Sequence, residues 1–259
     1  PDVGASADTA AGDSVPPPGP RLRWIHIEGK AEDALVLLAD EFHLHRLAVE
    51  DVVKSPQRAK LDLYDSEIFM VTHSPELIEG NFGLQFVPNQ VSLFCLQRAG
   101  VLLTFQQHEN KTRNSWTERV RERIRHNVDG VCGARLCYLL YASLDCILDR
   151  YFPLLEFYGD RMEELESVVI DDPKPGLIKG IIRLKRDILL IRRLIYPYRE
   201  SMSRLILLDA SLVDNVTKLY LKDVYDHIIQ VVEILETYRD VSLGLLDLYL
   251  GATDQRTQQ

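Results

Sequence analysis

The feature of this sequence that most constrains its fold is a long stretch without proline near the C-terminal end, residues 211–250. Apolar or small side chains recur there at gaps of three and four residues: Val216, Tyr220, Val224, Ile228, Val231, Leu235, Tyr238, Ser242, Leu245 and Tyr249. This spacing predicts one long helix with an apolar seam along a single face. At 1.5 Å per residue the helix is roughly 60 Å long, so other helices of the chain, or copies of it, must cover the seam.

Two earlier segments show the same periodicity and predict a helical hairpin. The first runs from Cys137 to Val169 and the second from Leu177 to Leu205, with a Pro- and Gly-containing turn between them. Pro153 and Pro197 predict a bend in each helix. We expect the two helices to pack antiparallel along matching seams. The first is rich in acidic residues and the second in basic ones, so pairs worth about 0–1 kcal/mol each are expected to set the register.

The first half of the chain alternates short strand-like segments with helices and predicts an α/β unit. Bounded apolar runs predict strands at Trp24–Ile27, Leu61–Tyr64, Glu67–Thr72, Gly83–Val87, Val91–Leu96 and Val101–Phe105. Helices are expected at Ala31–Phe42, Leu47–Val53 and Thr112–His126. The last two strands, joined by Arg98–Gly100, predict a hairpin in the middle of the sheet.

These expectations define an α+β fold class: an α/β sandwich domain followed by a long antiparallel helical hairpin and a long stalk helix. Residues 1–20 are Pro-rich and are expected to form a disordered tail. Residues 21–130 are expected to form the α/β domain with a central mixed sheet. Residues 131–259 are expected to form the long-helix region, with the hairpin at 134–207 and the stalk helix at 211–255.

Composition excludes several classes of function. The formal net charge is −9, which argues against binding to nucleic acid. The four cysteines have neither CxxC nor zinc-knuckle spacing and are expected to be reduced structural thiols. No apolar run reaches the length of a membrane span and no signal peptide is evident, so we expect a soluble fragment. No nucleophile elbow, HExxH, P-loop or dinucleotide motif occurs in a suitable context, so an enzyme is not expected.

Several blocks resemble, in the same order, the CorA-type magnesium and divalent-cation channels. They are Leu47–Val52, Gln57–Lys60, Val120–Arg125, Tyr138–Tyr141 with Asp145 and Asp149, Lys185–Asp187 with Arg192 and Arg193, Asp223–His227, Glu236–Arg239 and Gly244–Leu250. The resemblance covers roughly residues 21–255. It implies the N-terminal cytoplasmic domain of such a protein, without the transmembrane helices.

The resemblance also implies how the whole protein is organised. The family's Gly-Met-Asn signature and two membrane helices are expected to follow Gln259. The whole protein is expected to be a homopentamer whose C-terminal helices lie in the inner cell membrane, with this domain on the cytoplasmic face. The fragment alone is expected to be monomeric or differently associated.

The resemblance further implies regulatory metal sites for Mg²⁺, with Co²⁺, Ni²⁺ or Zn²⁺ as other possible ions. Asp51 and Asp223 are expected to hold one ion across a subunit boundary, and so to stabilise the closed state. Glu50 and Asp145 are expected to complete a second, weaker site. Asp247 is a candidate for an acidic ring around the symmetry axis. His227 shows no ligand spacing and is expected to be structural or exposed.

Two alternatives remain open on the sequence alone. One is the zinc-transporting branch of the same family, which has the same architecture but a different ion. The other belongs to another class: an oligomeric scaffold whose long helices form a coiled coil that does not depend on metal. For the scaffold, the carboxylates named above are only solvated helix faces.

Overall fold

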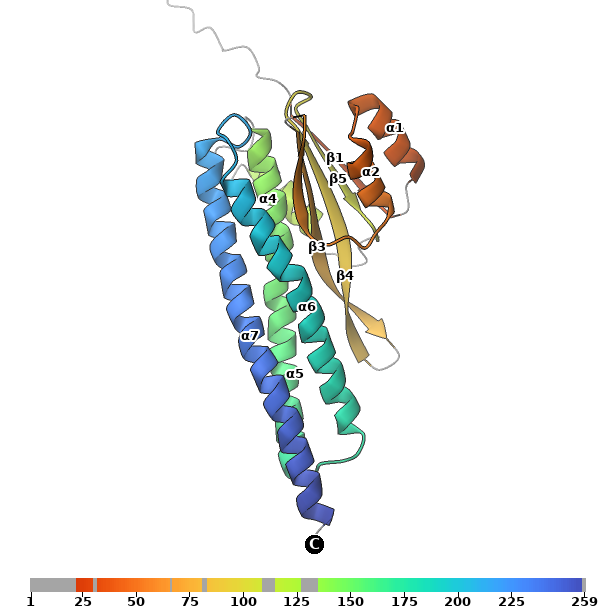
Figure 1. Ribbon diagram of the computed structural model, residues 1–259, viewed down its shortest axis with the longest axis vertical. Helices are drawn as coiled ribbons and strands as arrows, with labels where there is room; N and C mark the ends of the chain where they lie inside the picture. Colours follow the sequence, from red (N-terminus) through yellow and green to blue (C-terminus); the bar gives the residue numbers. More distant parts are fainter. Residues whose placement is uncertain are drawn as a thin grey trace, which may run out of the picture.

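A computed structural model describes residues 22–29, 32–65, 67–80, 83–108, 115–126 and 135–257 (Figure 1). The predicted tail at 1–20 and the Gly-containing break at 128–133 lie outside the described residues. The elements are β1 (Arg23–Glu28), α1 (Glu32–Phe42), α2 (Arg46–Val53), β2 (Lys60–Tyr64), β3 (Glu67–Gly80), β4 (Gly83–Leu96), β5 (Val101–Gln106), α3 (Trp116–His126), α4 (Leu136–Leu148), α5 (Tyr151–Asp171), α6 (Leu177–Ile206) and α7 (Asn215–Thr257).

The strands form one mixed sheet in the order β1-β5-β4-β3-β2. β1 pairs parallel with β5, and the other neighbours are antiparallel. The mixed sheet and the central β4–β5 hairpin are therefore confirmed. Gly100 closes that hairpin with a φ of 64°, a conformation that glycine adopts without strain.

One strand prediction was wrong: residues 83–87 and 91–96 are parts of a single strand, β4, which pairs along its length with β3. Pro88 had indicated an interruption, but it lies opposite Pro75 in the β3–β4 register. At this position β3 has already passed the end of β2, and β4 lies outside its pairing with β5. Each proline therefore has one side with no neighbouring strand. Its missing N–H can face that side, where it removes no hydrogen bond between strands.

Both faces of the sheet are covered. Leu93 and Cys95 on β4 point into the core shared with the long helices, whereas Phe94 and Leu96 point into the core beneath α1 and α2. Figure 1 shows α1 and α2 on one side of the sheet and α4 to α7 on the other. Because successive strand residues face opposite layers, strands buried on both faces read as continuous apolar runs.

The predicted hairpin has the right order, but its packing differs from the prediction. The first helix is divided at Asp149 and Arg150 into α4 and α5, which is the bend expected ahead of Pro153. α5 and α6 run antiparallel, yet α6 packs more extensively on α7 than on α5. The charge pairing follows the same pattern, since Arg192 of α6 binds Glu236 of α7 at 2.8 Å. The seams of α5, α6 and α7 therefore meet in one core.

α7 begins four residues later than predicted, because Asp214 caps it. The Asp214 carboxylate accepts hydrogen bonds from the backbone N–H groups of Val216 and Thr217, both at 3.1 Å. In this first part of the helix Thr217 and Leu221 are buried, whereas Val216 of the predicted seam is exposed. From Val224 onward the predicted seam faces the core, apart from partial exposure of Tyr238.

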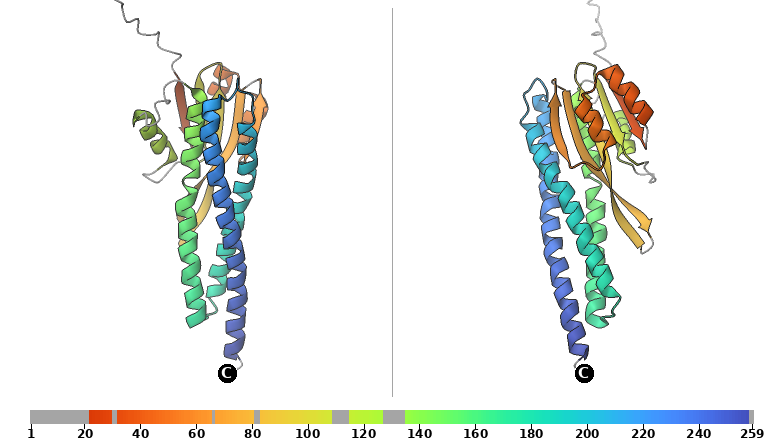
Figure 2. Two further views of the ribbon diagram at one scale, coloured as in Figure 1. Left: turned by 90° about the vertical axis from the view of Figure 1, so that its left-hand side faces the viewer. Right: turned by 45° about the vertical axis from the view of Figure 1, so that its right-hand side comes forward.

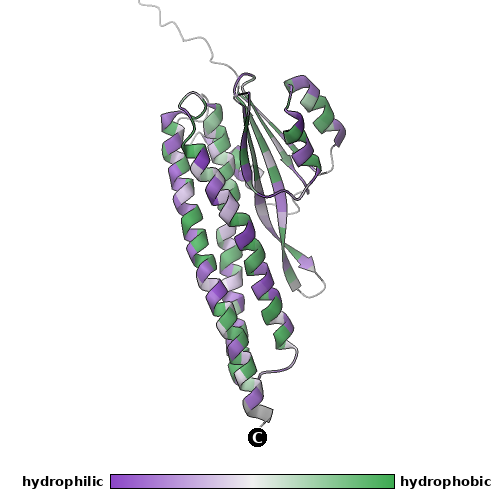
Figure 3. Cartoon of the chain, viewed as in Figure 1, coloured by the Kyte–Doolittle hydropathy of each residue, from purple (hydrophilic) through white to green (hydrophobic). Residues whose placement is uncertain are grey.

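α7 is 43 residues long, but charged residues recur along it. Figure 3 shows hydrophilic and hydrophobic segments alternating along this helix and along α5 and α6. Within the described ranges, no helix is both long enough and apolar enough to cross a membrane.

Candidate metal site

Two carboxylates and one imidazole come together where α4 ends against α7. Asp145 and Asp149 are four residues apart at the end of α4, so they share one face of the helix. His227 reaches them from α7, and the potential ligand atoms of the three side chains all lie within 4.8 Å of one another. The prediction that His227 is only structural or exposed therefore missed its place beside two carboxylates.

The charge of this group is balanced by α3, which lies beside α4 (Figure 2). Arg123 Nη1 lies 2.7 Å from Asp145 Oδ2, and Arg119 Nη1 lies 3.5 Å from Asp149 Oδ2. Burial raises the pKa of Asp145, although the hydrogen bond from Arg123 opposes the shift. His227 Nδ1 is buried and has no hydrogen-bond partner among the described residues. The Nδ1 atom of the imidazole is therefore available to a further ligand or hydrogen-bond partner.

The donor set constrains which cation the group could hold. Carboxylate oxygens suit Mg²⁺, but Mg²⁺ rarely takes nitrogen ligands. Imidazole together with carboxylates is a set that Zn²⁺, Co²⁺ or Ni²⁺ can use. Any of these ions would have to compete with Arg119 and Arg123 for the carboxylates.

Asp51, the first sequence-predicted ligand, lies on α2 and already has a cationic partner. Lys60 Nζ on β2 lies 2.5 Å from Asp51 Oδ2 and 3.0 Å from Asp62 Oδ2. Burial acts to lower the pKa of Lys60, but its hydrogen bonds to Asp51 and Asp62 outweigh this and raise it. Lys60 is therefore held in the charged form beside Asp51.

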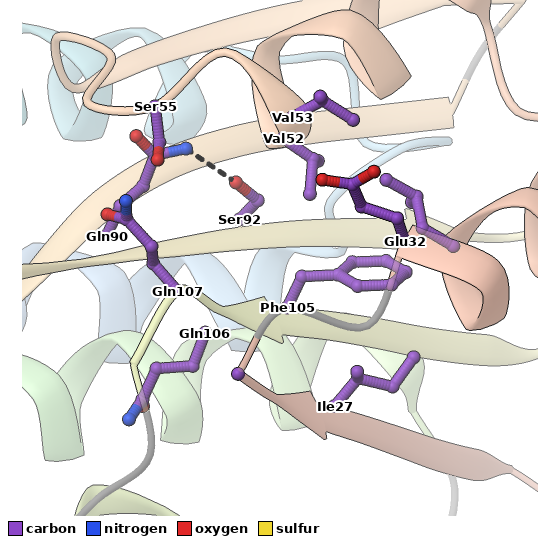
Figure 4. Close-up of a pocket in the computed structure, with 12 residues that line it drawn as sticks. Ile27, Glu32, Val52, Val53, Ser55, Gln90, Ser92, Phe105, Gln106 and Gln107 are labelled. Atoms are coloured by element: carbon purple, nitrogen blue, oxygen red, sulfur yellow. Dashed lines mark hydrogen bonds between the residues drawn. The ribbon is translucent and has the colours of Figure 1, made fainter.

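The backbone beside Asp51 is held by Gln90 of β4. Gln90 Nε2 donates to the Asp51 carbonyl oxygen at 3.2 Å, and Gln90 Oε1 accepts from the Gln57 N–H at 2.6 Å. Gln90 also forms part of the wall of a pocket of about 290 Å³ between α1, α2 and the sheet, where its amide donates to Ser92 (Figure 4). These hydrogen bonds fix the end of α2 against the sheet.

Asp223, the second predicted ligand, is exposed on α7. No hydrogen bond or ion pair joins its side chain to another described residue. The chain does not bring Asp51 and Asp223 together, because α2 and α7 lie on opposite faces of the sheet (Figure 1).

The remaining candidates also lie apart. Glu50 is exposed on α2 and pairs with Lys54 at 2.5 Å, whereas Asp145 lies on the other side of the sheet on α4. Asp247 is exposed near the C-terminal end of α7. Sequence reasoning missed the roles of Asp149, His227 and the two arginines of α3. The signals for this group were the spacing of Asp145 and Asp149 and the place of these residues and of His227 in the blocks that resemble the family.

Comparison with known proteins places this fold and sequence among metal-ion transporters. The model of a family described as CorA-like Mg²⁺ transporter protein matches residues 20–259. The cobalt/magnesium transport protein CorA of Thermotoga maritima is 33% identical over 241 residues, which cover 91% of this chain and 65% of that protein. The chain thus spans slightly less than two thirds of that relative.

Solved structures share the fold at low sequence identity. The soluble domain of CorA from Methanocaldococcus jannaschii matches with a TM-score of 0.73 and 16% identity, covering 88% of each chain. The ZntB cytoplasmic domain from Vibrio parahaemolyticus matches with a TM-score of 0.64 and 18% identity, covering 91% of this chain and 88% of that chain. These likenesses concern the fold alone.

Proposed function

The chain belongs to the CorA-like Mg²⁺ transporter family, and on this premise we propose that it is the metal-sensing part of a divalent-cation transport protein. The observation that carries the proposal is the family match over residues 20–259, which includes both α2 and α7. We place this part on the cytoplasmic side of the membrane, where it senses the ion that the whole protein transports.

In this proposal, Asp51 of one subunit and Asp223 of a neighbouring subunit share one Mg²⁺. Two features support a site between subunits. Asp51 and Asp223 lie on helices that cover opposite faces of the sheet, so one ion can bridge these elements more readily between two copies. Asp223 is exposed and makes no side-chain interaction with the described residues, so it is available to a neighbour. Mg²⁺ keeps most of its waters and needs only one or two carboxylates.

Exposed apolar residues on α7 support self-association, which we propose to be pentameric in the whole protein. Val241 and Leu248 are one heptad apart, as are Leu243 and Leu250, and these side chains are 38–48% exposed. They do not belong to the core seam formed by Ser242, Leu245 and Tyr249. The two pairs form separate apolar stripes on the two sides of the core seam, because residues two apart in a helix point to nearly opposite sides. Apolar stripes at heptad spacing are what additional helices would cover.

The proposed site acts as a switch through charge. Without metal, two carboxylates that face each other across a subunit boundary repel. A shared Mg²⁺ removes this repulsion, so the ion binds better to the assembly in which the carboxylates are close and shifts the population toward it. In a transport protein, this closed assembly would form when internal Mg²⁺ is high.

Limited proteolysis tests the proposed ligands. We expect millimolar Mg²⁺ to slow cleavage of the protein, and the double variant Asp51→Asn/Asp223→Asn to lose this protection. The matched control is Asp226→Asn, which removes another exposed carboxylate three residues away on α7. Equal Mg²⁺ protection of the double variant and the parent would show that these residues are not the ligands.

A second candidate function is transport of Zn²⁺ or another transition metal by the same architecture. The observation that favours it is the imidazole of His227 beside Asp145 and Asp149, because nitrogen ligands suit Zn²⁺ and Co²⁺ better than Mg²⁺. Flux measurements on the full-length protein with Mg²⁺, Co²⁺ and Zn²⁺ separate the two. Selective Zn²⁺ flux, reduced by His227→Ala, would favour the second candidate over the first.

A metal-independent coiled-coil scaffold is the alternative of another class. Its oligomeric state would be the same in EDTA and in Mg²⁺. The gene sequence beyond Gln259 provides an independent test of transport. We expect two apolar spans and the Gly-Met-Asn signature there, and their absence from the complete gene would exclude a transporter of this family.

A further inference from the structure

Two cysteines that are far apart in the sequence meet where the sheet contacts the helices. Cys95 is on β4 and Cys137 is in the first turn of α4, and both sulfurs approach the side-chain amide of Gln97. Gln97 Nε2 lies close to both sulfurs, 2.9 Å from Cys137 Sγ and 3.8 Å from Cys95 Sγ. Both thiols are free.

The surroundings of Cys137 favour its thiolate form. The Gln97 amide donates to the sulfur at 2.9 Å. One contact opposes ionisation, because the Leu212 carbonyl oxygen, 2.9 Å from Cys137 Sγ, accepts from the protonated thiol. Its position in the first turn of α4 adds the positive end of the helix dipole. Cys137 also lines a surface pocket of about 400 Å³, through which a small molecule can reach it.

The two thiols have opposite electrostatic environments. The hydrogen bond from Cys95, supported by Gln97, lowers the pKa of Cys137 against the effects of burial and of the Asp214 charge. Asp214 is itself paired with Arg135, which limits its repulsion of a thiolate. The same hydrogen bond, together with burial and the charges of Cys137 and Glu67, raises the pKa of Cys95. Cys137 lines the surface pocket, whereas Cys95 is fully buried, so Cys137 is the nucleophile and Cys95 is the thiol held next to it.

We propose that Cys137 and Cys95 form a peroxide-reactive thiol pair that closes into a disulfide. The Cys137 thiolate attacks one peroxide oxygen: an S–O bond forms, the O–O bond breaks, and the departing oxygen takes a proton and leaves as water or an alcohol. Sulfur loses two electrons in this step and the peroxide gains them. The Cys95 sulfur then attacks the Cys137 sulfenic acid, an S–S bond forms, and the hydroxyl group leaves with the Cys95 proton as water.

The disulfide would join the two layers of the molecule. It would bind β4 of the sheet to α4 of the helical layer and enclose β5 and α3 in one covalent loop. α3 carries the arginines that balance Asp145 and Asp149, so oxidation would restrict the element that faces the candidate metal site. The inference concerns thiol chemistry alone and does not rest on the proposed transport function.

Peptide mapping after treatment with hydrogen peroxide tests the pair. Trypsin cleaves after Arg135 and so separates Cys132 from Cys137, and a Cys146→Ser background leaves one thiol in the Leu136–Arg150 peptide. We expect the Cys95 peptide to be linked to the Cys137 peptide, with reversal by dithiothreitol. In Cys95→Ser or Cys95→Ala, Cys137 should accumulate as a sulfenic acid that dimedone traps.

Cys146 in the parent protein is the matched control for reactivity. It is a buried thiol on the same helix, and burial raises its pKa to about 12. We expect Cys137 to react with peroxide about tenfold faster or more. Reaction of Cys137 no faster than Cys146 would overturn the proposal. A disulfide from Cys137 to Cys132 or to a second chain, in place of Cys95, would overturn it as well.

Discussion

At the scale of single residues, the buried carboxylate of Asp187 on α6 lowers the stability of the folded chain. Tyr158 Oη donates to Asp187 Oδ2 at 3.0 Å, and Arg186 Nε lies 4.0 Å from Oδ1. Burial raises the pKa of Asp187 above its ordinary value of 3.8, and these partners only partly offset the shift. A charged form that is less favourable in the folded chain than in the unfolded chain destabilises the fold.

We therefore predict that Asp187→Asn stabilises the protein at neutral pH by about 1 kcal/mol. The pKa of Asp187 is higher in the folded chain than in the unfolded chain. Its charged form therefore destabilises the fold fully above the folded pKa, and the destabilisation disappears as the pH falls below the unfolded pKa. The gain from Asn should therefore be present at pH 7 and absent near pH 3. Urea denaturation at both pH values measures it, and an equal gain at both would contradict the electrostatic cause.

Tyr158→Phe provides the complementary prediction at the same contact. It leaves the Asp187 carboxylate buried without its hydroxyl donor, so we expect a loss of about 1–3 kcal/mol at pH 7. In the Asp187→Asn background the same change should cost less, because a neutral amide is less expensive to leave unpaired. A double-mutant cycle of urea denaturation midpoints gives the difference.

Lys60 provides a second residue-scale prediction, because it occupies the position of a cation beside Asp51. Lys60→Gln removes the ammonium 2.5 Å from Asp51 Oδ2, so Mg²⁺ no longer competes with it. We expect the Mg²⁺ concentration that half-protects the protein from proteolysis to fall about two- to fivefold. Lys54→Gln removes the same charge from the partner of Glu50 and should leave the midpoint nearly unchanged. Equal midpoints for Lys60→Gln and the parent would argue against Asp51 as a ligand.

At the scale of helices, one close approach determines how α5 packs on α7. A Cβ atom added at Gly159 of α5 would lie 2.6 Å from Tyr238 Oη, which itself donates to the Leu155 carbonyl oxygen at 3.0 Å. Glycine at this position lets the tyrosine reach the α5 backbone. We predict that Gly159→Ala costs about 1–3 kcal/mol, because the ring must move and the hydrogen bond is lost. Thermal or urea unfolding measures the loss.

The control for Gly159 is another helical glycine on the same hairpin. A Cβ atom at Gly180 of α6 would lie 3.6 Å from Leu165 Cδ2, which is an ordinary contact. Gly180→Ala should therefore be neutral or stabilise by up to about 1 kcal/mol through helix propensity. Tyr238→Phe should rescue part of the Gly159→Ala loss, since the nearest remaining ring atom is 3.4 Å away. Without rescue, the contact with Tyr238 is not the cause.

At the scale of the whole molecule, the outer face of α7 predicts association. Leu248→Glu places a charge on the exposed apolar stripe of Val241 and Leu248 while leaving the core seam intact, so we expect weaker self-association in Mg²⁺ with little change in monomer stability. Light scattering after gel filtration, in Mg²⁺ and in EDTA, measures the effect. Leu207→Glu is the control, because Leu207 is 79% exposed after the end of α6, away from this face. An equal effect of both variants would exclude α7 as the interface.

Local patterns were sufficient for the elements themselves. The spacing from Val224 to Tyr249 predicted a long helix with one buried side, and Arg98–Gly100 predicted the central hairpin, because periodicity and turn chemistry act within a few residues. Local signals failed where a distant partner decided the outcome. Pro88 indicated a break in the strand, but β3 and β4 each have no second neighbouring strand at this position, so the proline fits within β4. At the start of α7, Thr217 is buried in the core, whereas Val216, which was predicted to be there, is exposed.

The sequence by itself determined the family, the mixed sheet and the long helices, since these depend on residue order and on short-range periodicity. Only the tertiary structure decided that α7 covers both α5 and α6, and that His227 lies beside Asp145 and Asp149. The same is true of the approach of Cys95 and Cys137 to one side chain, Gln97. The physical reason is that these contacts join side chains on separate elements. Their approach depends on how whole layers pack, which no local pattern encodes.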